Sequence, residues 1–135
     1  MKFGLVFEQV FDKPIERVWK AITDRREMKT WLLDTNFVPE IGRSFEMWCE
    51  NDDGSIDTYH CQVLELEPPR QMLWSWVLAG RESEGLTYVA FELEPVETGT
   101  KLTLTHSGDR DSATIEMFRL GWPAKLRALA AGMDE

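Results

Sequence analysis

Two adjacent residue pairs, His106-Ser107 and His60-Cys61, have the side-chain types that covalent catalysis uses. A serine or cysteine nucleophile needs a base whose side chain converges on it. Both pairs are expected within strands, where neighbouring side chains point to opposite faces of the sheet. Neither pair can therefore act as nucleophile and base, and no serine-nucleophile motif is present. A pairing of His106 with a distant cysteine stays geometrically open, but no motif supports it.

The other chemistry-bearing residues predict no metal site and no phosphate loop. The two cysteines and two histidines are scattered, without the close spacing of metal ligands. The nine glycines are dispersed as turn residues. Glu65 and Glu67 share a strand face, as do Glu92 and Glu94, but their alternation with leucines indicates a solvated exterior. The sequence thus predicts no metal, no cofactor and no catalytic residue.

The composition excludes several classes of partner. Among 135 residues, 15 Lys and Arg stand against 24 Asp and Glu, a net charge of -9 that repels nucleic acid and anionic membranes. A hydrophobic content of 43% suits one core, so residues 1–135 are expected to form a single domain. No secretory signal and no run of 18 apolar residues is found, and two cysteines suggest reduced thiols. The expected location is the cytoplasm.

The first third of the chain predicts one strand and two short helices. Phe3–Phe11 has apolar residues on both faces of a strand, and which face points inward is left open. Asp12 is expected to cap a helix and Pro14 to preset its first turn, and the apolar spacing predicts an amphipathic helix that ends near Thr23. Asp24 begins a capping-box pattern that predicts a second, short helix.

The rest of the chain predicts a series of strands and then a long helix. Turn residues separate five strand segments, which favours sequential antiparallel pairing. These segments are Ser44–Glu50, Tyr59–Glu67, Met72–Leu78, Leu86–Glu94 and Lys101–Ser107. After Gly108, apolar residues at spacings of three and four predict a helix that ends near Gly132, in which Pro123 causes a kink near residues 119–122.

This order of elements predicts an α+β fold in which a curved antiparallel sheet of six or seven strands wraps around the C-terminal helix. A twisted sheet must cover its apolar face, and only the last helix is long and apolar enough to do so. One helix cannot fill the full width of such a sheet, so a space is expected between them, closed at one end by the two short helices. This space is the expected binding site.

Four segments carry a resemblance to a known family. They are Pro14–Asp24 followed by Trp31, then Pro68–Trp76, Leu102–Gly108 and Gly121–Pro123. In this order they resemble the bacterial branch of the Hsp90-ATPase-activator-homologue family, within the helix-grip superfamily that is also called START or birch-allergen-like. The resemblance covers nearly the whole chain. It implies a helix-grip fold, a small-molecule cavity in most of the superfamily, and a chaperone-activating surface in the eukaryotic namesake, whose additional N-terminal domain is not found in this sequence.

Strand periodicity selects the side chains expected to line the space, together with apolar positions on the helices. They are Trp31, Phe45, Met47, Met72, Trp74, Trp76, Val89, Phe91, Leu104, His106, Phe118 and Trp122. Two interpretations stand for His106. It is either a structural histidine bonded to a backbone carbonyl or to the last helix, or a polar anchor for a ligand. For Trp76 and Trp122, core packing and a ligand wall are equally favoured.

Three functions fit this reading. The first is binding of an apolar or amphipathic small molecule between the sheet and the C-terminal helix. The second, which rests on the family resemblance, is a protein-interaction module that modulates a chaperone ATPase of the Hsp90 type. The third is an enzyme of the cyclase or hydrolase type that works inside the cavity, with His106 as its catalytic residue, although the sequence supplies no catalytic set.

Overall fold

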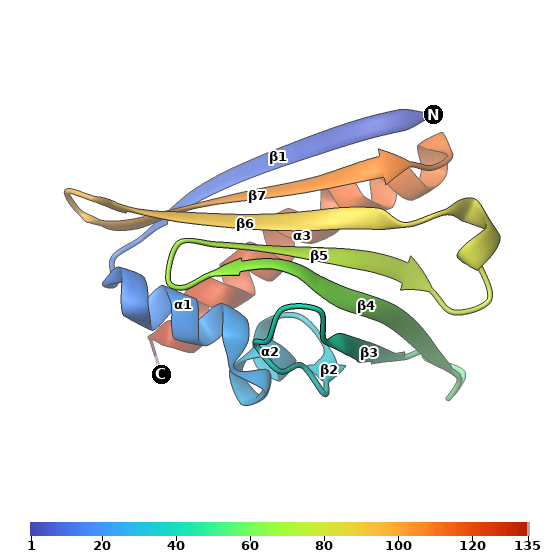
Figure 1. Cartoon of the computed structure of the whole chain (residues 1–135), viewed down its shortest axis with the longest axis horizontal. Coiled ribbons are helices and arrows are strands. Elements are labelled where there is room, and N and C mark those ends of the chain that lie inside the picture. The colour runs from blue at the N-terminus through green and yellow to red at the C-terminus, as the bar shows by residue number, and fades with distance from the viewer. Residues whose placement is uncertain (135) are drawn as a thin grey trace.

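A computed structural model describes residues 1–134 as a seven-stranded antiparallel sheet and three α-helices (Figure 1). The strands lie in the order β1-β7-β6-β5-β4-β3-β2, so each strand from β2 onward pairs with the next one in sequence and β7 returns to pair with β1. The α+β helix-grip architecture predicted from the sequence is confirmed.

The elements follow the predicted order, with one short 3-10 helix, η1, added between β5 and β6. Their bounds are β1 Lys2–Phe11, α1 Ile15–Thr23, α2 Arg25–Trp31, β2 Asp34–Thr35, β3 Ser44–Glu50, β4 Ile56–Glu67, β5 Gln71–Leu78, η1 Glu82–Glu84, β6 Thr87–Val96, β7 Gly99–Asp109 and α3 Ser112–Met133. The two-residue strand β2 was not predicted. Within residues 1–134, no helix is long and apolar enough to cross a membrane.

Helix starts agree with the sequence at Asp24 but not at Asp12. The Asp24 carboxylate accepts hydrogen bonds from the backbone N–H groups of Arg26 and Glu27, at 2.9 and 3.3 Å, and so caps α2. The cap position of α1 is occupied by Pro14, without a side-chain cap, so the expectation for Asp12 is wrong. The long helix α3 continues through Pro123 and ends at Met133, one residue beyond the expected stop.

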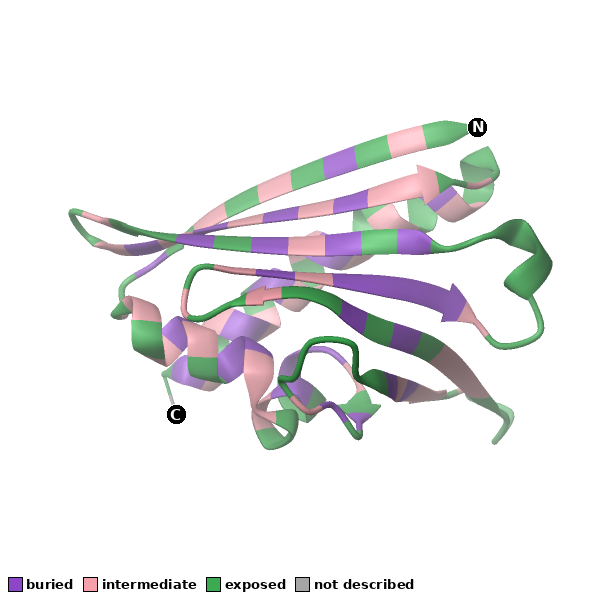
Figure 2. Ribbon diagram, in the orientation of Figure 1, coloured by how far each residue is buried: buried purple, intermediate pink, exposed green. Residues whose placement is uncertain are grey.

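Alternation along most strands separates an apolar inner face from a solvated outer face, whereas residues 74–77 of β5 are buried on both faces (Figure 2). It also settles the orientation of β1. Leu5 and Phe11 are buried, whereas Val6 and Val10 are 60% and 51% exposed. The odd-numbered side chains of β1 therefore face the helix side of the sheet.

Helix α3 lies across the inner face of the sheet, and α1 and α2 pack against its C-terminal half (Figure 1). Side chains fill the end of the interior that lies next to α1 and α2. The Trp31 indole N–H donates to the carbonyl of Ala21 at 2.9 Å, and its ring meets Phe91 edge-on at 6.4 Å. Leu126 and Leu129 of α3 complete this buried cluster. The two short helices thus close one end of the space between sheet and helix, as expected.

Gly99, in the β6–β7 hairpin, lies in close contact with the end of the edge strand β1. Its φ is +149°, and a Cβ there would overlap the carbonyl oxygen of Phe11. Gly99→Ala is therefore expected to lower the free energy of unfolding by roughly 2–3 kcal/mol. Gly4 lies in β1 with open space around it, and Gly4→Ala should change the value by less than about 0.5 kcal/mol. Denaturant unfolding measures both, and equal values for the two variants would contradict the close contact.

Candidate functional site

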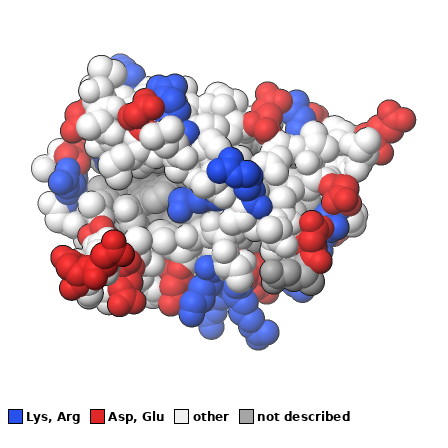
Figure 3. Space-filling model, turned by 180° about the vertical axis from the view of Figure 1, so that it is seen from behind, with Lys and Arg blue, Asp and Glu red and all other residues white. Residues whose placement is uncertain are grey.

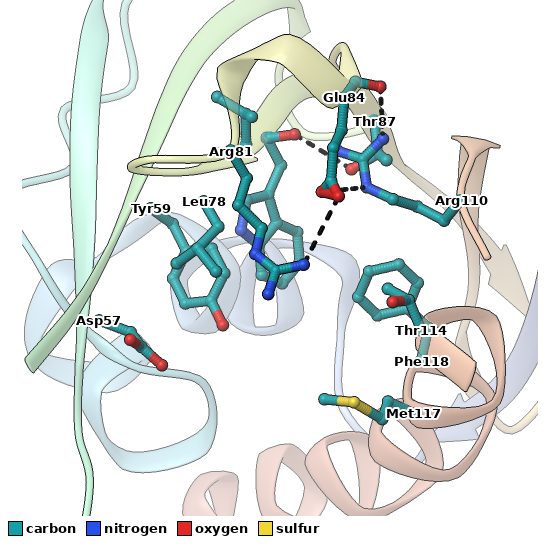
Figure 4. A pocket seen from close by; sticks show the side chains of 12 residues that line it. Asp57, Tyr59, Leu78, Arg81, Glu84, Thr87, Arg110, Thr114, Met117 and Phe118 are labelled. Carbon is teal, nitrogen blue, oxygen red and sulfur yellow. Dashed lines mark hydrogen bonds and ion pairs between the residues drawn. The ribbon is translucent and has the colours of Figure 1, made fainter. Parts of the chain in front are cut away.

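The end of the interior that lies away from α1 and α2 is hollow. A cavity of about 240 Å³ opens there between β4, β5, the η1 segment and the start of α3 (Figure 4). Tyr59 and Leu78 lie on one side of it, and Thr114, Met117 and Phe118 of α3 lie on the other. The face of the molecule opposite to that of Figure 1 shows a hollow with basic side chains at its edge (Figure 3).

A second cavity of about 160 Å³ continues along α3 toward its middle. Its lining is largely apolar and consists of Leu33, Cys49, Tyr59, Trp76, Met117, Phe118, Gly121, Trp122 and Lys125. Four of these residues, Tyr59, Trp76, Met117 and Phe118, also line the larger cavity. The two cavities therefore adjoin and share an aromatic partition.

Strand register and helix periodicity explain this partition. Tyr59 and Cys61 point inward from β4, and Cys61 is paired with Trp76 of β5. The Tyr59 and Trp76 rings meet edge-on with centroids 5.2 Å apart. Phe118 approaches from α3, with its centroid 6.4 Å from that of Trp76. Burial raises the pKa of the Tyr59 hydroxyl, with smaller contributions from Asp57 and Cys49, so this hydroxyl stays protonated at neutral pH.

The structure divides the twelve predicted site residues into a wall and a core. Trp76, Phe118 and Trp122 border the cavities. His106 lies directly behind this wall and lines neither cavity. The other eight are buried in the core cluster: Trp31, Phe45, Met47, Met72, Trp74, Val89, Phe91 and Leu104. The inward direction predicted for them is correct, but packed side chains fill the space around them.

His106 is completely buried and both of its ring nitrogens are bonded within the protein. The Trp122 indole N–H donates to Nδ1 at 3.0 Å, so Nδ1 carries no proton. Nε2–H must then donate to Thr87 Oγ1, 3.0 Å away, and the Thr87 hydroxyl donates to the carbonyl of Trp76 at 3.1 Å. Both ring nitrogens of His106, the Trp122 indole N–H and the Thr87 hydroxyl all have partners. His106 is therefore bonded as a structural histidine, and Trp122 of the last helix is one of its two partners.

The surroundings of the ring favour the neutral imidazole. It stacks on Trp76 with an interplanar angle of 1° and lies 4.2 Å from the Phe118 centroid. Burial, with a further contribution from the positive charge of Arg110, lowers the pKa of His106 to about 3. Within residues 1–134 no carboxylate bonds to the ring, so this histidine lacks the orienting partner of a catalytic triad.

The mouth of the larger cavity is held by Arg110. Its guanidinium donates to the carbonyls of Glu84 and Gly85 at 3.0 and 2.7 Å, and its side chain is only 9% exposed. Glu84 also forms an ion pair with Arg81 at 3.5 Å (Figure 4). These contacts fix the η1 segment over the cavity. The Glu84 carboxylate also lies 3.8 Å from Arg110, so both guanidinium groups share this one carboxylate.

Sequence reasoning missed most of the residues that line the cavities, among them Tyr59, Arg110, Met117 and Lys125. The period of two in β4 could have indicated Tyr59, since it shares a face with Cys61 and Val63. Met117 is 69% exposed and so follows no buried stripe of α3. Neither Arg110, in the loop before α3, nor Lys125 had a motif to mark it.

The remaining nucleophiles and ligand types stay apart. Cys61 is buried, and burial raises the pKa of its thiol, which keeps it protonated and a poor nucleophile. Neither cysteine forms a disulfide. Within residues 1–134 no group of three histidine, cysteine or acidic side chains is arranged to hold a metal ion.

A curved antiparallel sheet that clasps one long helix, with a cavity between them, defines a helix-grip protein, and this fold commonly binds ligands in that cavity. The family model "Activator of Hsp90 ATPase homolog 1-like protein" matches residues 12–134, so the chain belongs to this family. No curated protein matches the chain.

Solved bacterial structures extend the likeness over nearly the whole chain. Protein MLL2253 from Mesorhizobium loti is 29% identical with a TM-score of 0.86, and the match covers 98% of this chain and 97% of that one. Protein CV1439 from Chromobacterium violaceum is 23% identical with a TM-score of 0.83 and 96% coverage of each chain. CalU16 from Micromonospora echinospora is 24% identical, with a TM-score of 0.80, 98% coverage of this chain and 76% of its own. The last two show the fold alone.

The buried imidazole of His106 makes the free energy of unfolding decrease as the pH falls. The pKa of His106 is about 3 in the fold and about 6.5 in an unfolded chain, so between these values the unfolded chain binds the extra proton. The contribution of His106 is complete above pH 6.5 and is lost as the pH falls toward 3. From pH 6 to 4, wild type should lose up to ~1.4 kcal/mol per pH unit more than His106→Gln.

Urea unfolding at several pH values measures this difference. His60→Gln is the control, since His60 lies on the outer face and its variant should keep the wild-type slope. If the wild-type and His106→Gln profiles run parallel, the imidazole is not held neutral by the fold.

Proposed function

We propose that this protein binds an apolar or amphipathic small molecule in the two adjoining cavities between the sheet and α3. The observation that carries the proposal is the shared wall of Tyr59, Trp76, Met117 and Phe118, which presents apolar surface to empty space instead of to packed neighbours. Sites for small molecules are typically concave, mostly apolar and equipped with a few polar groups. Both cavities fit this description.

The position of the hollow supports a binding role over a packing defect. It lies at one end of the interior, while the opposite end is closely packed around Trp31, Phe91 and Leu126. Met117, at the mouth, is 69% exposed, and a thioether side chain adapts readily to different apolar surfaces. The family and fold add independent support, since helix-grip proteins commonly use this space for ligands.

The polar groups of the larger cavity suit orientation of a ligand more than catalysis. Thr87 and Arg110 use their donors on backbone carbonyls, and the Thr87 hydroxyl oxygen also accepts a hydrogen bond from His106. A general base must reach the proton that it removes, with a pKa near the working pH. The buried His106 meets neither condition in this structure. Binding is therefore the function that the geometry favours.

A glycine in α3 allows the cavity to be filled without damage to the core. Gly121 lines the smaller cavity, and no atom lies within 4 Å of a Cβ placed on it. Gly121→Leu should fill this space and also stabilise the helix by about 0.5–1 kcal/mol, because glycine is a poor helix former. The expected result is a more stable protein whose affinity for an apolar fluorescent probe, N-phenyl-1-naphthylamine, falls at least tenfold.

Ala124→Leu is the matched control, since Ala124 lies on the exposed face of the same helix. It should retain wild-type affinity. Binding follows from probe fluorescence and stability from thermal unfolding. Absence of probe binding to wild type, or equal binding to Gly121→Leu and wild type, would exclude the cavity as the site.

A further inference from the structure

Lys125 differs from every other basic residue that the structure describes. Eight of the 15 lysines and arginines form ion pairs with carboxylates within 4 Å. Six of the remaining seven are exposed to water: Lys2, Lys20, Arg25, Arg26, Arg70 and Arg127. Lys125 is the seventh. Among residues 1–134 it is the one basic side chain that is both partly buried and without a carboxylate partner.

The surroundings of Lys125 are apolar. Its side chain lines the smaller cavity together with Leu33, Trp122 and Gly121, and a cysteine and a tyrosine are the other polar groups there. Burial lowers the pKa of its ammonium group, and the only opposing influence is Cys49. An ammonium ion in such a place has lost part of its hydration and has gained no counter-ion.

The other basic side chains of the site have a carboxylate partner. At the far end of the larger cavity, Glu84 forms ion pairs with both Arg81 and Arg110, at 3.5 and 3.8 Å. Asp57 lies on the rim of the same cavity (Figure 4). Among the described residues that line the two cavities, Lys125 is thus the one lysine or arginine without a carboxylate partner, and it lies at the apolar end.

We infer that the ligand is an amphipathic organic anion whose acidic group pairs with the Lys125 ammonium and whose apolar body lies along Tyr59, Trp76 and Phe118. This inference rests on the proposed function and names the chemical class of its ligand. A carboxylate or sulfonate at Lys125 forms a charge-assisted hydrogen bond in surroundings that screen it weakly. The apolar body then extends through the aromatic partition into the larger cavity.

The size of the site restricts the ligand further. Cavities of about 240 and 160 Å³ that share one wall accept a molecule with a two- or three-ring body, or a chain of similar volume. With a net charge of -9 the protein repels anions at a distance. An anion without an apolar body is therefore not retained, and selectivity requires both parts of the ligand.

Two fluorescent probes with the same aromatic body separate the two contributions. 8-Anilinonaphthalene-1-sulfonate carries the acidic group, and N-phenyl-1-naphthylamine lacks it. Lys125→Met keeps the length and apolar stem of the lysine and removes its charge. The variant is expected to weaken binding of the sulfonate about tenfold and to change binding of the neutral probe by less than twofold. Lys125→Arg should restore most of the affinity for the sulfonate.

Arg127→Met is the matched control, because it makes the same change of net charge on an exposed position of α3 and should affect neither probe more than twofold. Near-ultraviolet circular dichroism verifies that each variant keeps its tertiary packing. If Lys125→Met weakens both probes equally, or weakens neither, the charge of Lys125 does not select the ligand and the inference is overturned. If wild type binds neither probe, the proposed function fails as well, so the two failures are distinguishable.

Discussion

The fold depends on one chain of buried hydrogen bonds that ties α3 to the sheet. Trp122 of α3 donates to His106 of β7, which donates to Thr87 of β6, which donates to the backbone of β5 at Trp76. Each link contributes about 0.5–1.5 kcal/mol, and loss of one partner leaves a buried polar group unsatisfied, at a cost of about 1–3 kcal/mol. Apolar packing alone is not directional and would let the helix slide along the sheet. The chain of hydrogen bonds fixes both the position of α3 along the sheet and its rotation about the helix axis.

The position of this chain explains where the cavity lies. C-terminal to Trp122, apolar residues of α3 pack into the cluster formed with α1 and α2. The C-terminal half of the helix is therefore closely packed. N-terminal to Trp122, α3 presents Phe118 and Met117 to the sheet, and the opposing positions on β4 and β5 carry Tyr59 and Trp76. The curvature of the sheet separates these two surfaces. The Arg110 clamp on the η1 segment then holds the mouth, so the hollow belongs to the folded state and does not require a conformational change.

Much of the fold was predictable because the spacing of apolar residues along the sequence distinguishes strands from helices. The change from a period of two to spacings of three and four marked every long element, and the inward faces of β5, β6 and β7 followed from alternation alone. The site was less predictable. Alternation says that Trp74 and Trp76 both point inward, but not that Phe37, Phe45 and Phe91 pack around Trp74 while Trp76 borders empty space. That difference depends on distances between elements far apart in the sequence. The role of Lys125 could not be predicted for the same reason, because its lack of a carboxylate partner depends on which residues surround it in the fold.

His106 and Lys125 show how satisfaction of polar groups separates structure from function within one interior. The sequence left two interpretations for His106, a structural histidine and a polar anchor for a ligand, since it places an imidazole on an apolar strand face. In the fold both of its nitrogens are occupied, so a ligand could reach it only by breaking the bonds that hold α3. Lys125 has the opposite character, because its side chain is partly withdrawn from water and no carboxylate within residues 1–134 pairs with it. A buried polar group with all its bonds made stabilises the empty protein, whereas one with a bond missing gains most when a partner arrives. On this physical ground the polar specificity of the cavity is assigned to the ammonium group and not to the imidazole.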